Sequence, residues 1–285
     1  MSSTAERMLT VGVVGAGTMG VGIAYVFAAT GSEVTVVEPD RERIRLARKT
    51  IQEQAAIAYQ RGKLDGAAVA SIAERVRWVS ATDDLPAGLE LAVEAVPERA
   101  DLKRDVLARM ESREPIVLAT NTSGIGIGEL AAGLRRPEAF VGLHFFNPVW
   151  SMPLVEIVRG RQTGDVALSR ARIAVAQIGK EKIVVADTPG FATSRLGVVI
   201  GLEAMRMLED GVASAEDIDR AMELGYRHPM GPLRLSDLVG LDVRLDIATH
   251  LVKTYGSRFE PPAILVDKVA AGDLGRKTGR GFYTW

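Results

Sequence analysis

The stretch TVGVVGAGTMGVGIAYVFAATGSEVTVVE, Thr10 to Glu38, decides the fold of this chain. An apolar run from Thr10 to Val14 leads into the glycine-rich turn GAGTMG, and an alanine- and valine-rich segment follows to about Ala29. Gly31 ends that segment, and the apolar run EVTVVE comes next. This order predicts a strand, a tight turn, a helix and a second strand, which together form a βαβ unit.

Gly15, Gly17 and Gly20 in this stretch form the pattern G-x-G-x-x-G. Alone the pattern is weak, because glycine-rich turns are common. Here it follows a predicted strand and opens a predicted helix, which is the context of dinucleotide binding. The first glycine permits the tight turn, the second lets the backbone approach a pyrophosphate, and the third lets helix and strand pack closely. The helix N-terminus then offers N–H groups to the phosphates.

Glu38 ends the second strand, eighteen residues after Gly20. A carboxylate at this place accepts hydrogen bonds from the adenine ribose and repels a 2′-phosphate. The sequence therefore predicts NAD, rather than NADP, as the cofactor. Thr18 and Met19, inside the glycine pattern, are expected to contact it as well. Arg41 and Arg43 could in principle pair with a phosphate, but a solvated first turn of a helix is the better explanation.

Length, composition and net charge limit the class of protein to which the chain can belong. The chain has 285 residues, 25% of them charged, with a formal net charge of -1, so no global field attracts nucleic acid or an anionic membrane. There are no cysteines, which excludes disulfides and thiolate metal sites. Three histidines without a carboxylate cluster make a metal site unexpected. No signal peptide or membrane-spanning run is recognisable, so a cytoplasmic protein is expected.

Further apolar runs alternate with helical stretches, which favours a mostly parallel, doubly wound sheet of the Rossmann type. The predicted strands after Glu38 are RVRWVS, LELAVEAV, PIVLATN, FVGLHFF, LVEIV and KIVVAD. After DTPGF the pattern becomes helical, with Ser214 as an N-cap and a further helical segment over 238–256. We expect an NAD-binding domain over 1–189 and an all-α substrate or dimerisation domain over 190–285.

His144 and Glu156 stand out in the stretch GLHFFNPVWSMPLVEIV, 142–158, which otherwise has the pattern of two buried strands. An unpaired buried carboxylate is strongly disfavoured, so the simplest arrangement pairs the two side chains. Asn147-Pro148 and Met152-Pro153 favour turns that would bring the strands together. A carboxylate on one ring nitrogen fixes the tautomer and makes the other nitrogen a better base.

These features together resemble the L-3-hydroxyacyl-CoA dehydrogenase family. The resemblance extends over residues 11–283 and rests on the segments VGVVGAGTMGVGIA, VEAVPERADLK, NTSGI, GLHFFNPVWSMPLVEIVRG, TPGF, LGYRHPMGPLRLSDLVGLD and LGRKTGRGFY. It implies NAD-dependent interconversion of (S)-3-hydroxyacyl-CoA and 3-ketoacyl-CoA, with a short acyl chain. It also implies a homodimer.

The resemblance implies roles for individual residues. The catalytic set is His144 as general base, Glu156 to orient it, Ser123 and Ser194 at the substrate oxygen, and Asn147 at the nicotinamide end. The further cofactor contacts are Asn121, Glu98, Lys103 and Lys277. Arg61 and Lys63 are candidates for CoA contacts, although surface solvation explains them as well.

Two positions depart from the family pattern. Ser194 stands where the family commonly has Asn, so a direct contact with the substrate carbonyl can become water-mediated. Gly124 replaces the second Ser of N-T-S-S, which leaves Ser123 in place.

Two other readings stay open at this point. One is a dehydrogenase of a free hydroxy acid or sugar acid, of the gulonate type. The other is a non-catalytic NADH-binding or structural protein on the same fold. The dimer is also open, since the apolar faces that suggest it suit an intrachain core equally well. Those faces contain Val198, Ile200, Leu202, Met205, Met207 and Leu208.

Overall fold

The computed structural model describes residues 9–285, which fall into two compact units, one ending at Asp187 and one running from Thr188 to Trp285. Residues 1–8 lie outside the described residues. The expectation that the chain has no signal peptide rests partly on these residues. Within 9–285, no helix has the length and apolar character needed to cross a membrane.

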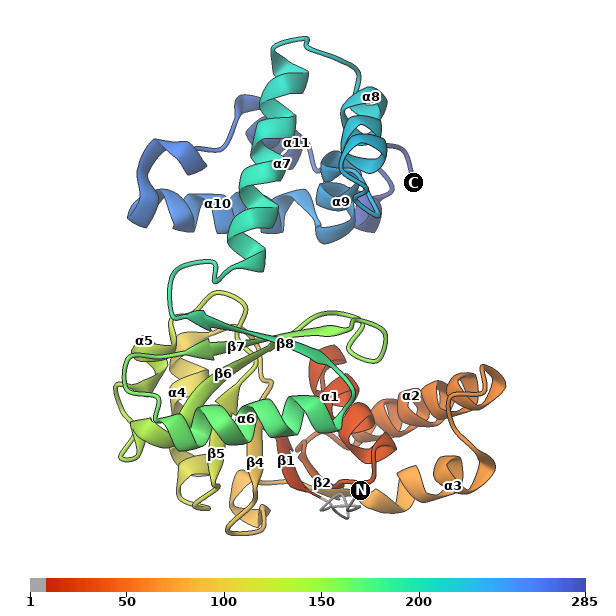
Figure 1. Cartoon of the computed structure of the whole chain (residues 1–285), viewed down its shortest axis with the longest axis vertical. Coiled ribbons are helices and arrows are strands. Elements are labelled where there is room, and N and C mark those ends of the chain that lie inside the picture. The colour runs from red at the N-terminus through yellow and green to blue at the C-terminus, as the bar shows by residue number, and fades with distance from the viewer. Residues whose placement is uncertain (1–8) are drawn as a thin grey trace, which may run out of the picture. The chain divides into compact units, whose positions relative to one another are not determined.

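One sheet forms the centre of the described part of the first unit (Figure 1). Its strand order is β3-β2-β1-β4-β5-β6-β7-β8, and only the β6–β7 pairing is antiparallel among the described strands. The strands are β1 (Thr10–Val14), β2 (Glu33–Val37), β3 (Val76–Val79), β4 (Leu91–Glu94), β5 (Val117–Thr120), β6 (Phe140–Phe145), β7 (Leu154–Arg159) and β8 (Glu181–Ala186). The chain reverses direction of winding between β1 and β4, where doubly wound folds bind ligands.

Helices cover both faces of this sheet. They are α1 (Thr18–Ala29), α2 (Arg41–Gln60), α3 (Gly66–Arg75), α4 (Ala100–Glu111), α5 (Ile127–Ala131) and α6 (Asp165–Gln177), with short 3-10 turns η1 (Thr82–Asp84) and η2 (Pro137–Ala139). Val11 and Val13 of β1 lie in one apolar core with residues of α1 and α6. Gly12 between them faces Leu85 and Leu89 on the opposite side. This alternation is the period of two expected for a strand buried on both faces.

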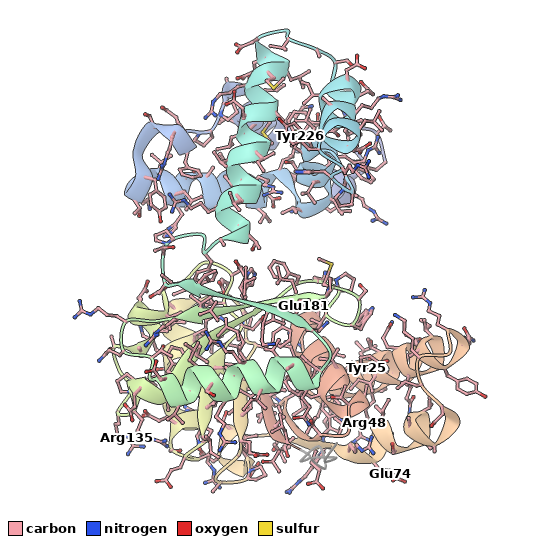
Figure 2. All side chains as sticks on the ribbon, in the orientation of Figure 1. Tyr25, Arg48, Glu74, Arg135, Glu181 and Tyr226 are labelled. Atoms are coloured by element: carbon pink, nitrogen blue, oxygen red, sulfur yellow. The ribbon has the colours of Figure 1, made fainter. Side chains whose placement is uncertain are left out.

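The α1–α2 contact is partly polar. The Tyr25 hydroxyl donates to the backbone oxygen of Gln54 at 3.3 Å, which joins the two helices. Charged side chains such as Arg48, Glu74 and Arg135 lie at the surface (Figure 2). The first unit therefore has the ordinary distribution of an apolar interior and a charged exterior.

The described part of the second unit is helical. Its elements are α7 (Thr193–Glu209), α8 (Ala215–Arg220), the π-helical turn η3 (Ala221–Gly225), α9 (Pro232–Val239), α10 (Leu241–Tyr255), η4 (Gly256–Phe259), α11 (Ala263–Ala270) and η5 (Arg276–Thr278). Ser214 caps α8, as predicted, by accepting from the Asp217 N–H at 3.1 Å. The predicted fold class, a Rossmann-like sheet domain followed by a helical domain, is confirmed.

The helical segment predicted over 238–256 is divided in the structure between two helices. Gly240 has a φ of +107° and separates α9 from α10. This conformation favours glycine, so the break is built into the sequence although helical periodicity continues across it.

The C-terminal segment is held by a buried carboxylate. Asp237 is 1% exposed and accepts from the backbone N–H groups of Phe282 and Tyr283 and from the Trp285 indole, each at 2.9 Å. Gly275 and Gly281 lie so close to Asp237 that a Cβ at either would overlap it. The close packing against Asp237 explains why Gly275 and Gly281 of the segment LGRKTGRGFY are glycines.

Candidate active site

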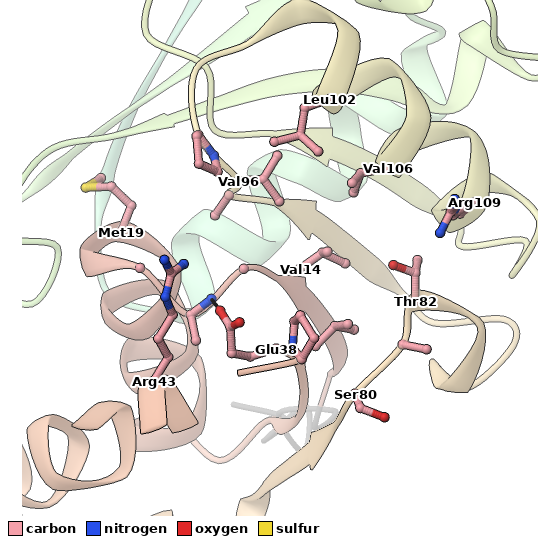
Figure 3. Close-up of a pocket in the computed structure, with 18 of the residues that line it drawn as sticks. Val14, Met19, Glu38, Arg43, Ser80, Thr82, Val96, Leu102, Val106 and Arg109 are labelled. Carbon is pink, nitrogen blue, oxygen red and sulfur yellow. Dashed lines mark hydrogen bonds between the residues drawn. The ribbon is translucent and has the colours of Figure 1, made fainter. Parts of the chain in front are cut away.

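A cavity of about 650 Å³ lies where β1, β2 and β4 end, next to the glycine-rich turn (Figure 3). Its lining includes all residues from Val14 to Met19, together with Glu38, Arg43 and the loop after β3. The position at the carboxyl ends of the strands is the one that the doubly wound fold predicts.

The three glycines of the turn have different surroundings. Gly15 has a φ of +103°, and a Cβ there would lie 2.8 Å from the backbone oxygen of Ala95. A Cβ on Gly20 would overlap the backbone oxygen of Gly15, whereas one on Gly17 would meet nothing within 4 Å. Gly15 and Gly20 are thus required for packing, and Gly17 leaves its backbone accessible to a ligand. Gly17 is also the N-cap of α1, so the first N–H groups of that helix are available to phosphate oxygens.

Glu38 is buried beside this turn. One carboxylate oxygen accepts from the Ala16 N–H at 3.2 Å, and the other accepts from the Asp40 N–H at 3.1 Å. Figure 3 shows the carboxylate joined to the turn at the wall of the cavity, with Arg43 nearby. The Glu38 carboxylate keeps lone pairs that can accept hydrogen bonds from the ribose hydroxyls. Its negative charge disfavours a cofactor that carries a phosphate on this ribose. The glycine-rich turn and the Glu38 carboxylate therefore fit NAD.

The cavity also has an apolar wall that the sequence did not indicate. Val96, Leu102 and Val106 form it, and Arg109 lies at its edge (Figure 3). Such residues suit a flat aromatic ring such as adenine. No pattern in the sequence distinguishes them from ordinary core positions of a helix, so only the packing of α4 beside β4 reveals them.

Two glutamates and a lysine form an ionic group at the end of β4, in which Glu94 and Lys103 are buried and Glu98 is partly exposed. The Lys103 ammonium donates to the two carboxylate oxygens of Glu94 at 2.8 and 3.0 Å and to the Val96 backbone oxygen at 3.2 Å, and it lies 3.2 Å from Glu98. Glu94 is 0% exposed and also accepts from the Thr120 hydroxyl at 2.6 Å. Lys103, which the sequence places at the cofactor, is therefore bound to protein oxygens.

Glu98 holds the loop that follows β5. One of its oxygens accepts from the Thr122 hydroxyl at 2.6 Å and from the N–H groups of Ser123 and Gly124 at 2.9 and 3.1 Å. Burial acts to raise the pKa of Glu98, but the Lys103 charge and the donors of the loop outweigh it and hold that pKa below its ordinary value. Glu98 is thus charged at neutral pH and fixes the backbone around Ser123.

Asn121 connects this loop to the next strand. Its side-chain oxygen accepts from the Phe145 N–H at 2.9 Å, and its own N–H donates to the Glu94 backbone oxygen at 2.8 Å. The ends of β4, β5 and β6 are therefore joined by polar contacts. Phe145 directly follows His144, so the network reaches the proposed base.

His144 and Glu156 are directly opposite each other in the antiparallel β6–β7 pair. The His144 Nδ1 and a Glu156 carboxylate oxygen are 2.7 Å apart, and the two residues are 7% and 0% exposed. This distance confirms the predicted pairing of the side chains. A short contact between a buried carboxylate and an imidazole favours a proton on Nδ1 and leaves basic character on Nε2.

Lys180 fixes the loop between these two strands. Its ammonium donates to the backbone oxygens of Val149 and Met152, each at 2.6 Å, and burial lowers its pKa. Asn147 belongs to the same loop and is exposed. No sequence pattern indicates this role of Lys180, because a lysine ahead of a strand usually lies in solvent.

The remaining predicted site residues lie elsewhere. Arg61 and Lys63 are exposed at the turn between α2 and α3 of the first unit. Ser194 is partly buried in the first turn of α7, in the second unit. Lys277, also in the second unit, pairs with Asp242 at 2.6 Å.

Comparison with known proteins gives the family of the chain. The family model described as "3-hydroxyacyl-CoA dehydrogenase, NAD binding domain" matches residues 10–188, and the one described as "3-hydroxyacyl-CoA dehydrogenase, C-terminal domain" matches residues 190–285. The chain belongs to the 3-hydroxyacyl-CoA dehydrogenase family. It is an NAD-dependent oxidoreductase that interconverts 3-hydroxyacyl-CoA and 3-ketoacyl-CoA.

Individual relatives of this dehydrogenase match over nearly their whole length. A 3-hydroxybutyryl-CoA dehydrogenase of Mycobacterium tuberculosis is 41% identical over 290 residues, with all of both chains covered. The crystal structure of FadB2 from M. tuberculosis has a TM-score of 0.90 at 41% identity, covering 98% of this chain and 100% of that one. The (S)-3-hydroxybutyryl-CoA dehydrogenase PaaH1 of Ralstonia eutropha has a TM-score of 0.93 at 39% identity, covering 98% and 99%.

The cofactor preference of this dehydrogenase is tested at Glu38. We expect Glu38→Gln to bind NADH about tenfold more weakly and to bind NADPH relatively better, because the change removes a negative charge beside the ribose. Fluorescence titration with both nucleotides measures the ratio, and Glu53→Gln, on the exposed side of α2, controls for net charge. An unchanged ratio of NADH to NADPH affinity would contradict the assignment of Glu38.

Proposed function

We propose that the chain acts on short (S)-3-hydroxyacyl-CoA substrates, such as 3-hydroxybutyryl-CoA, and on the corresponding 3-ketoacyl-CoA. The names of the relatives support the chain length, since proteins 41% and 39% identical to this chain are called 3-hydroxybutyryl-CoA dehydrogenases. The observation that carries the chemistry is the 2.7 Å contact between His144 and Glu156 at the carboxyl end of the sheet.

The proposed catalytic step is general-base catalysis by His144. Its Nε2 takes the proton of the substrate hydroxyl in the oxidation direction and returns it in the reduction direction. Glu156, at Nδ1, keeps the imidazole in the required tautomer and stabilises the imidazolium that forms. When bound, NAD supplies the acceptor for the hydride that leaves C3 of the substrate. Base catalysis of this kind contributes about 10²- to 10⁴-fold, and positioning of the reactants supplies much of the remainder.

The other site residues have positioning and binding roles in this proposal. Ser123 and Ser194 donate hydrogen bonds to the substrate oxygen, and Asn147 orients the nicotinamide end of the cofactor. The glycine-rich turn, Thr18 and Met19 hold the pyrophosphate, and Glu38 holds the adenine ribose.

Lys103 is proposed to act on the cofactor site through Glu98, because its donors are bound to protein oxygens. Glu98 in turn holds the Ser123 loop. Asn121 and Lys277 are kept as cofactor contacts, and Arg61 and Lys63 as contacts to CoA phosphates.

We also propose a homodimer formed through the second unit. Three of the apolar residues from which the sequence suggested pairing, Val198, Leu202 and Met205, lie in an intrachain core instead. Other apolar side chains of α9 and α10 support the dimer, because Leu235, Leu238, Val239 and Val243 are 36–42% exposed along consecutive helices. A cytoplasmic location stays a prediction from the sequence.

The substrate class is tested by NADH oxidation with acetoacetyl-CoA and with free acetoacetate. We expect acetoacetyl-CoA to have a kcat/KM at least about 10³-fold higher, because binding of the CoA moiety supplies energy that positions the keto group. Comparable turnover of free acetoacetate would favour a dehydrogenase of free hydroxy acids. Absence of turnover with any acyl-CoA would favour a non-catalytic protein.

The base is tested by His144→Gln in the same assay. We expect kcat to fall by about 10²- to 10⁴-fold while NADH binding, followed by fluorescence, is retained, because Gln cannot accept the proton. His250→Gln is the matched control, since His250 is exposed on α10. Turnover of His144→Gln within a few-fold of the parent would exclude His144 as the base.

A further inference from the structure

The loop over 146–153 connects the strand of His144 to the strand of Glu156 and begins beside the imidazole. Phe146 is its first residue, and the centroids of the Phe146 and His144 rings are 4.5 Å apart. Asn147, proposed above to orient the nicotinamide end of the cofactor, comes next and is exposed. The position of this loop therefore sets the surroundings of the proposed base.

The middle of the loop packs on helix α1, whose first residues line the cofactor cavity. Val149 is 1% exposed and lies so close to α1 that a Cβ on Gly22 would be 2.7 Å from its own Cβ. The rings of Trp150 and Tyr25 meet edge to face, with centroids 6.5 Å apart. Gly22 thus makes room for the loop against the helix that begins at the glycine-rich turn.

Lys180, at the start of β8, binds the same part of the loop. Its ammonium donates to the backbone oxygens of Val149 and Met152, each at 2.6 Å. An ammonium carries three donors on one atom, so it can hold two backbone oxygens together. Lys180 is 9% exposed, and lysines are rarely so covered unless their charge has partners of this kind. Val149 is therefore held by Lys180 at its backbone and by α1 at its side chain.

We propose that Lys180 is a positioning residue for hydride transfer and that it acts through the loop over 146–153. Lys180 and Gly22 fix this loop to β8 and to α1, so that Asn147 and His144 keep one position relative to each other. The inference rests on the proposed function, in which His144 is the base and Asn147 orients the nicotinamide. Displacement of reacting groups by about 1 Å costs about 10²-fold in rate, so contacts remote from the reacting atoms control kcat.

A purely structural role of Lys180 is the competing explanation. A group that serves only stability lowers the melting temperature, but it leaves kcat unchanged at a temperature at which the variant is folded. A positioning role lowers kcat in the folded enzyme. Binding of NADH should change little in that case, because the contacts made by Glu38 and the glycine-rich turn lie at the other end of the cofactor.

The first test is Lys180→Met, which keeps an apolar stem and removes the donors. At a temperature at which the variant is folded, we expect kcat with acetoacetyl-CoA to fall about tenfold to a hundredfold, whereas KM and NADH affinity stay within a few-fold of the parent. Amide exchange of the peptide that contains 146–153 should be faster, because two of its backbone oxygens have lost their donor. Lys182→Met, at an exposed lysine two residues further on, should keep the parent values.

Gly22→Ala displaces the loop at its other contact and provides a second variant in case Lys180→Met does not fold. We expect the same fall in kcat and the same faster exchange of the loop. Gly66→Ala, at a position where a Cβ would meet nothing within 4 Å, is the matched control and should show neither. Because both changes act on one loop, the combined variant should lose less than the product of the two separate effects.

Parent kcat in folded Lys180→Met or in Gly22→Ala would overturn the inference. So would a loss of NADH affinity as large as the loss of kcat, or a combined variant whose loss equals the product of the separate effects. His144→Gln separates this result from a failure of the proposed function. If Lys180→Met keeps its kcat and His144→Gln loses it, only the role of Lys180 is excluded. If His144→Gln also keeps its kcat, the proposed base is excluded as well.

Discussion

The hydrogen bond between His144 and Glu156 is the interaction on which the site depends. Glu156 is completely buried, and the contact with His144 offsets part of the free-energy cost of burying its carboxylate. The antiparallel pairing of β6 with β7 puts the two residues opposite each other, and a slip of one residue would turn Glu156 to the other face. The strand register therefore determines whether the imidazole has an orienting acid.

The remaining polar contacts extend this constraint across the carboxyl edge of the sheet. Glu94 binds Lys103, Lys103 binds Glu98, Glu98 holds the Ser123 loop, and Asn121 connects that loop to the strand of His144. Charge-assisted hydrogen bonds are strong and directional, so the network favours one arrangement of the loop. The proposed donor to the substrate oxygen and the proposed base are thus positioned by one connected set of contacts, before any ligand binds.

Sequence patterns predicted the parts of this structure that depend on local order. The eight strands, the glycine-rich turn with Glu38, and the His144–Glu156 pair follow from periodicity, spacing and the unfavourable energy of an unpaired carboxylate. The features that sequence reasoning missed depend on packing between distant segments. Lysines usually lie at the surface, so the sequence does not show that Lys103 and Lys180 are buried. Their burial becomes evident only when their oxygen partners from other segments are seen. The break at Gly240 is hidden because helical periodicity continues on both sides of it.

We propose that Glu156 keeps the proton of neutral His144 on Nδ1, so that Nε2 is the base. Nitrogen-15 NMR of the protein labelled at histidine tests this directly, and a chain with three histidines gives a spectrum simple enough to assign by substitution. At a pH where His144 is neutral, we expect Nδ1 to carry the proton, with a strongly deshielded proton signal, and Nε2 to have the shift of an unprotonated nitrogen. A neutral His144 with its proton on Nε2 would exclude Nε2 as the base.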